Sequence, residues 1–117
     1  MKIKLKQLRK LVGINNTTTS IPKRFLGSTV VVRCRNAGVH SAVVESCDSS
    51  FLHLKKSHRV WLWKDAFTLS QLANDGISVG SKTGQENELT IPVQDVAEII
   101  LQSEKSRKTI LKYVTSN

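Results

Sequence analysis

TVVVRCRNAGVHSAVVE, residues 29–45, decides the fold. Valines crowd both ends of this stretch, and Asn-Ala-Gly at 36–38 supplies turn residues between them. The stretch therefore predicts a β-hairpin whose strands run over 29–35 and 39–45.

More strands are expected after this hairpin. The polar residues at 47–50 predict a second turn, and alternating apolar residues predict strands over 51–55 and 59–63, joined around 56–58. Four short strands joined in order form an antiparallel meander.

The apolar period then lengthens, which indicates a helix. Asp65 can cap a helix over 66–73, with Phe67 near its apolar face and Gly76 ending it. The remaining segments predict a short strand over 77–79, a polar loop over 80–87, an edge strand containing Pro92 over 89–93, a strand over 96–101, and a basic helix over 104–114 capped by Ser103.

The N-terminal residues 2–12 show both strand-like alternation and helical spacing, and we favour a short amphipathic helix followed by a linker at 15–20. The predicted fold is α+β: a small, mostly antiparallel β-sheet or half-barrel of about five to six strands, with one inserted helix and a helix at each end. A length of 117 residues permits one core. We therefore expect a basic arm and linker over 1–27 and a single β-rich domain over 28–117.

Charge is strongly polarised along the chain. There are 18 Lys and Arg against 9 Asp and Glu, a net charge of +9. Residues 1–27 contain no acid, whereas 67–101 contain five acids against Lys82 alone, and 102–117 are again basic. A block of like charge is typical of an interaction arm. The basic residues of this arm are Lys2, Lys4, Lys6, Arg9, Lys10, Lys23 and Arg24.

Three features bear on location. No run approaches the roughly 20 apolar residues of a membrane span, and the N-terminal MKIKLK is not followed by the apolar core of a secretory signal. Two cysteines without a disulfide framework fit a reducing compartment. We expect a protein of the host-cell cytoplasm or of a virion, neither secreted nor membrane-bound.

Five motifs stand out along the chain: VVRCRNAGVHSAVVE at 31–45, RVWLW at 59–63, LSQLA at 69–73 before Gly76, EII at 98–100 and EKSR at 104–107. Together they resemble a family of small bacteriophage and prophage proteins that is classed only as a domain of unknown function. The resemblance covers about residues 30–110 and leaves out the basic arm. It implies a viral origin and a small β-rich fold, and it supplies no activity and no site residue.

Metal and thiol chemistry receive little support. In the predicted hairpin Cys34 lies opposite His40 and Arg35 opposite Val39, while Cys47 runs beyond the paired region. A structural zinc site takes its thiolates in tight pairs, and these two cysteines are too far apart in sequence for that. We therefore expect no metal, no disulfide, no cofactor and no catalytic residue.

A near-miss to a phosphate-binding loop occurs at 76–83, GISVGSKT. Ser81 replaces the second glycine of the motif, whose lack of a side chain lets backbone N–H groups wrap a phosphate. The following residues also lead into a strand where the motif needs a helix. We interpret this segment as a turn.

A basic and aromatic constellation remains. Alternation puts Arg59, Trp61 and Trp63 on one face of their strand, and Arg33 and Arg35 on one face of theirs. If these two faces lie on the same side of the sheet, bases would stack on the indoles and phosphates would contact the arginines. With only six aromatic residues in the chain, the two tryptophans also suit the core.

These observations favour a non-enzymatic, phage-encoded accessory protein that binds a phosphate-rich partner, with nucleic acid as the first expectation. The arm would make the main phosphate contacts, helped by Arg33, Arg35, Arg59 and the C-terminal Lys and Arg residues. Two alternatives remain open. One is a capsid or tail accessory protein whose arm docks on an acidic subunit or packaged DNA, and the other is a sponge for a host defence nucleotide signal. Homo-oligomerisation also remains open.

Overall fold

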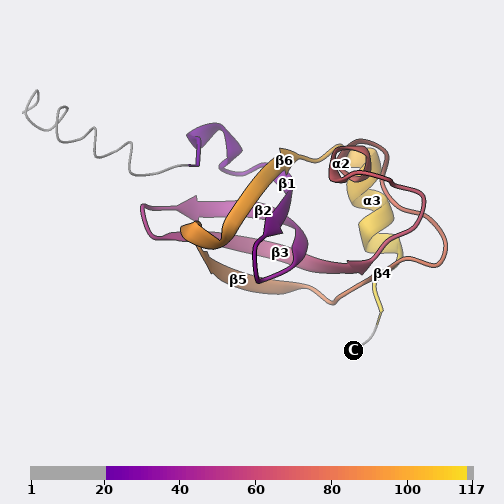
Figure 1. Ribbon diagram of the computed structural model, residues 1–117. Helices are drawn as coiled ribbons and strands as arrows, with labels where there is room; N and C mark the ends of the chain where they lie inside the picture. The colour runs from indigo at the N-terminus through magenta and orange to yellow at the C-terminus, as the bar shows by residue number, and fades with distance from the viewer. Residues whose placement is uncertain (1–20, 116–117) are drawn as a thin grey trace, which may run out of the picture.

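The computed structural model describes residues 21–115 and has an α+β fold (Figure 1). In chain order the elements are the 3₁₀-helix η2 (Lys23–Phe25), β1 (Thr29–Cys34), β2 (Val39–Cys47), β3 (Phe51–Leu62), α2 (Leu69–Asp75), β4 (Lys82–Thr83), β5 (Asn87–Pro92), η3 (Val93–Asp95), β6 (Val96–Leu101) and α3 (Glu104–Lys112). The predicted helix over 2–12 and the linker over 15–20 lie outside the described residues.

The six strands form one open sheet in the order β4-β3-β2-β1-β6, and β5 also pairs with β3. Every pairing between these strands is antiparallel. The long strand β3 carries β5 along its first part and β4 along its last residues. The predicted mostly antiparallel α+β fold is therefore confirmed, including its inserted helix and its C-terminal helix.

The third and fourth predicted strands are one continuous strand, so the turn predicted at 56–58 was wrong. Lys56 has a φ of 50°, and the pairing with both neighbours skips a residue around it, between Leu54 and Ser57 on the β5 side. This is a β-bulge, which bends a strand without ending it. Polar residues at a bulge look like a turn in sequence, because both interrupt the apolar alternation.

The register of the first hairpin also differs from the prediction. Arg33, and not Arg35, lies opposite Val39, and Val32 lies opposite His40. The reason is a longer turn, whose backbone N–H groups at Asn36 and Ala37 donate to the Asp95 carboxylate at 2.8 and 3.0 Å. A distant carboxylate thus satisfies turn groups that a tighter hairpin would have paired internally.

The inserted helix begins later than predicted. Thr68 is its N-cap, with its hydroxyl oxygen accepting from the Gln71 backbone N–H at 3.0 Å. Asp65 instead has a φ of 62° and accepts a hydrogen bond from the Ser78 hydroxyl. Gly76 ends the helix as predicted, at a φ of 88°, where a side chain would collide with Thr109.

The C-terminal part follows the prediction except near β4. The structure has no strand over 77–79 and instead forms β4 within the predicted polar loop. Within the described residues 21–115, the strand with Pro92 pairs with β3 and with no other strand, so it is an edge strand. The α3 N-cap is Ser103, whose hydroxyl oxygen accepts from the Ser106 N–H at 3.0 Å.

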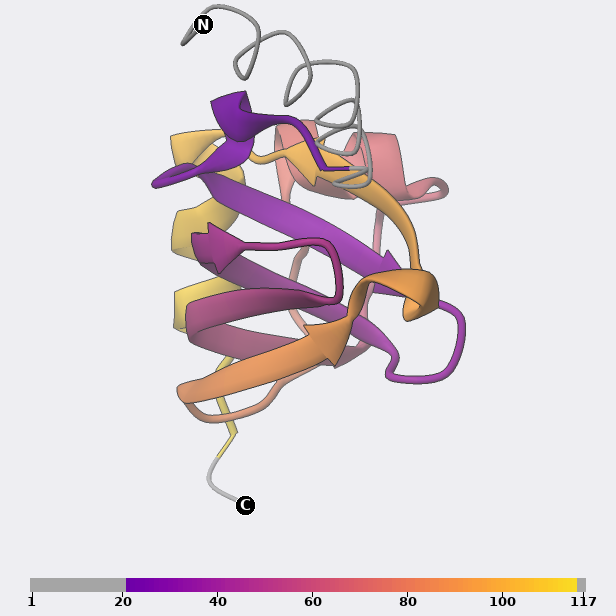
Figure 2. The same cartoon turned by 90° about the vertical axis from the view of Figure 1, so that its left-hand side faces the viewer.

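Apolar residues are buried on both faces of the sheet. Both helices lie together on one side of it (Figures 1 and 2). The cluster under α2 and α3 contains Val31, Val60, Leu72, Ala73, Ile77 and Ile110. The cluster on the other face contains Ile21, Phe25, Val30, Val32, Cys34, Ala42, Val44, Leu52, Leu54 and Ile91. A valine run buried on both faces explains why β1 reads as continuously apolar.

Among residues 21–115, the helices are too short or too polar to cross a membrane.

Candidate nucleic-acid interface

The two tryptophans near the end of β3 have different environments. Trp61 is 47% exposed. Trp63 is half-buried and packs against the apolar cluster under α2 and α3. The structure therefore does not present two indoles on one surface, and Trp61 is the ring that is open to a partner.

Lys82 lies over Trp61. Its Nζ is 5.4 Å from the centre of the indole, a distance at which a cation is attracted to the ring. The pairing of β3 with β4 brings Lys82 and Trp61 together. Lys82 pairs with Leu62, the residue after Trp61, and the register shifts between Val60 and Leu62. The next residue, Thr83, is buried and donates its hydroxyl to the Ile110 carbonyl at 2.9 Å, so Lys82 projects away from α3.

Arg59 projects to the same face as Trp61, because Val60 between them is buried under the helices. Two glycines flank its side chain. A Cβ on Gly38 would lie 3.5 Å from the Arg59 guanidinium, and one on Gly84 would lie 3.7 Å from the Arg59 Cβ. Arg59, Trp61 and Lys82 form what we call the β3–β4 patch.

The other predicted arginines lie elsewhere. Arg33 pairs with Val39, which packs under the helices, so it projects to the opposite face from Arg59. Its Nε donates to the Glu98 carboxylate at 2.9 Å. An exposed pair of this kind contributes little to stability. Arg35 is exposed in the turn after β1.

The basic arm is described only at its end. Lys23 and Arg24 are exposed on η2, and the Arg24 guanidinium lies 5.3 Å from the centre of the Phe25 ring. Lys2, Lys4, Lys6, Arg9 and Lys10 lie outside the described residues.

Most basic side chains have no acidic partner. Within residues 21–115, Arg33 is the one Lys or Arg that lies within ion-pair distance of a carboxylate. One C-terminal residue predicted to contact phosphate serves the fold instead: Arg107 donates to the Ser41 hydroxyl at 2.8 Å and to the Lys56 carbonyl at 2.7 Å. Burial lowers its pKa from the usual arginine value.

Residues 27–110 match the family described as Domain of unknown function (DUF6948). The chain belongs to this family. No curated protein and no solved structure matches it. The matched region contains the whole β3–β4 patch and excludes the basic residues of the arm, so the patch is part of the DUF6948 domain and the arm is an addition to it.

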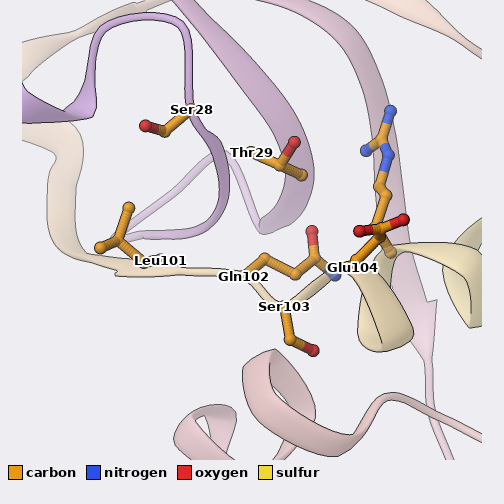
Figure 3. Close-up of a pocket in the computed structure, with 7 residues that line it drawn as sticks. Ser28, Thr29, Leu101, Gln102, Ser103 and Glu104 are labelled. Carbon is orange, nitrogen blue, oxygen red and sulfur yellow. The ribbon is translucent and has the colours of Figure 1, made fainter.

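A pocket of about 450 Å³ lies where β1, β6 and α3 meet (Figure 3). It is lined by Ser28, Thr29, Leu101, Gln102, Ser103, Glu104 and Arg107. Its polar groups hold α3 to the sheet, because Gln102 accepts from Ser41 at 2.6 Å and donates to Ser106 at 2.8 Å. The lining of this pocket of the DUF6948 domain contains one acid and one base, Glu104 and Arg107, so it has no excess of positive charge to attract a phosphate.

Cys34 and His40 of the first hairpin are both buried. Burial, together with Asp95, raises the pKa of the Cys34 thiol to about 11, which keeps it in the weakly nucleophilic protonated form. His40 lies opposite Val32 and bonds to the Ala37 carbonyl at 2.7 Å. Within residues 21–115, no three His, Cys, Asp or Glu residues cluster as metal ligands, and both cysteines are free thiols.

Proposed function

We propose that this protein is a non-enzymatic, phage-encoded accessory protein that binds nucleic acid in the host-cell cytoplasm or in the virion. The β3–β4 patch carries the proposal: an exposed indole with a lysine over it lies beside an arginine that has no acidic partner among residues 21–115. The resemblance of its motifs to those of bacteriophage and prophage proteins supports the phage origin.

The patch suits nucleic acid because it combines the two kinds of contact that such ligands need. Base stacking on an aromatic ring contributes about 1–3 kcal/mol per base and does not depend on sequence. Arg59 and Lys82 add positive charge on the same face, where phosphates next to a stacked base would lie.

The arm would add sequence-independent attraction to the same ligand. Its seven basic residues have no acid among them in residues 1–27. Each phosphate that a cation neutralises on a single strand contributes about −0.7 to the slope of log K against log salt. Replacing Lys2, Lys4, Lys6, Arg9 and Lys10 by glutamine should therefore make the salt dependence less steep by up to about 3.5.

Fluorescence anisotropy with a labelled oligonucleotide tests the proposal. Trp61→Ala should weaken binding by about 5- to 150-fold, the equivalent of one lost stacking contact. Arg59→Ala and Lys82→Ala should weaken it less, and most at low salt. Phe51→Ala, which removes a 43% exposed ring from the opposite end of β3, is the matched control and should change affinity little.

Two results would contradict the proposal. One is an affinity that stays constant as salt rises from about 50 to about 200 mM, because phosphate contacts release counterions. The other is equal affinity of Trp61→Ala and Phe51→Ala.

A further inference from the structure

The loops that follow β3 and precede β4 run side by side. The Lys64 backbone N–H donates to the Ser81 hydroxyl at 2.9 Å, and the Ser78 hydroxyl donates to the Asp65 carboxylate. A Cβ on Gly80 would lie 3.4 Å from the Lys64 side chain, so that side chain crosses Gly80. These loops, residues 63–68 and 76–81, extend the β3–β4 pairing beyond Leu62 and Lys82.

Phe67 projects from this pair of loops and is 92% exposed. Its backbone is held in place, because its N–H donates to the Gln71 side chain at 3.0 Å and the next residue, Thr68, caps α2. A ring on a fixed backbone loses little conformational freedom when it binds a ligand. Phe67 is therefore a second exposed aromatic ring on the chain segment that continues from Trp61.

The spacing and charge between these two rings fit a strand of nucleotides. Phe67 lies six positions after Trp61, so their Cα atoms are within about 22 Å of each other even along a fully extended chain. Lys82 and Lys64 lie at the pairing between them. Asp65 is the only acid in 59–68 and 76–83, and its carboxylate is bonded to Ser78.

We propose that the ligand of this surface is single-stranded nucleic acid, with bases stacked on Trp61 and Phe67 and the intervening phosphates at Lys64 and Lys82. This inference rests on the proposed function and names its substrate class. In a duplex each base is covered above and below by its neighbours, so an aromatic ring finds a free base face only on an unpaired strand. Trp63 is not part of this surface, because it packs under the helices.

Binding to a short single strand and to the duplex of the same sequence, measured for three variants, tests the inference. Phe67→Ala and Phe67→Leu should each weaken single-strand binding by about 5- to 150-fold and leave duplex binding unchanged. Leucine keeps the apolar bulk and lacks the aromatic face. Val79→Ala is the matched control, because Val79 is 79% exposed in the same pair of loops and has no ring. Circular dichroism would verify that each variant is folded.

Each outcome is decisive. If Phe67→Leu binds as tightly as the wild type, the side chain acts as an apolar contact, as for a protein partner, and the inference fails. If single strand and duplex bind equally and Phe67→Ala has no effect, the inference fails while the proposed function stands. If neither nucleic acid binds at any salt concentration, the proposed function fails and the inference fails with it.

Discussion

The two faces of the sheet around β3 use the same residue types in opposite ways. On the helix side, Trp63 packs into the apolar cluster and Arg107 donates to Ser41 and Lys56. On the other side, Trp61 is exposed and Arg59 has no acidic partner in the described part of the chain. An aromatic ring and a guanidinium stabilise the fold where the protein supplies their partners, and they are available to a ligand where it does not.

Replacing each of the two tryptophans by alanine, in separate variants, should give the largest difference in the free energy of unfolding. Trp63→Ala should lower the free energy of unfolding by about 2–3 kcal/mol, somewhat less than for a fully buried aromatic residue. Trp61→Ala should lower it by less than about 1 kcal/mol, because Trp61 is 47% exposed and lies outside the apolar cluster that Trp63 contacts. Urea unfolding measures both values. Equal losses would mean that the two rings have the same role in the fold.

The two arginines should repeat this contrast on a smaller scale. Arg107→Ala removes two charged hydrogen bonds between α3 and the sheet, at a cost of about 2 kcal/mol. Arg59→Ala should cost less than about 0.5 kcal/mol, since it removes no hydrogen bond or ion pair within residues 21–115. The same unfolding measurements apply, and a large loss in Arg59→Ala would assign that residue to the fold.

The buried histidine His40 should make the stability of the fold depend on pH. Burial lowers the pKa of His40 in the folded protein, against a smaller opposing effect of the Ala37 carbonyl. The unfolded chain therefore binds the proton more tightly, and stability should fall as pH drops below the unfolded value of about 6.5. One such group changes the free energy of unfolding by at most about 1.4 kcal/mol per pH unit.

Unfolding between about pH 8 and pH 5 tests this dependence. His40→Gln should reduce the slope. His53→Gln is the control, because His53 is only half-buried and pairs with the exposed Thr90 side chain. A slope that His40→Gln leaves unchanged would rule out His40 as its source.

Features set by neighbouring residues could be predicted from the sequence. The valine-rich strands, the Gly76 helix end and the Ser103 cap depend on local pattern, and all three are confirmed. Features set by distant residues were missed. The hairpin register depends on Asp95, and the inward position of Arg107 depends on Ser41, 66 residues away.

The candidate site shows the same division. Arg59 and Trp61 could be placed on one face by strand alternation, but Trp63 lies beyond the last residue of β3, where alternation no longer applies. Lys82 was missed because its strand has only two residues. Phe67 was assigned to a helix face because Asp65 resembles an N-cap, whereas Thr68 is the cap. A helix capped by Asp65 would have included Phe67 on its apolar face. With Thr68 as the cap, Phe67 lies just before the helix and its ring is exposed.

The most direct test of the account is to follow the two indole N–H signals by NMR while a single-stranded oligonucleotide is added. The account predicts that the signal of Trp61, assigned through Trp61→Phe, shifts and saturates as the complex forms, while that of Trp63 changes little. A shift of Trp63 with Trp61 unchanged, or no shift of either signal when binding is seen by anisotropy, would contradict the assignment of the β3–β4 patch as the interface.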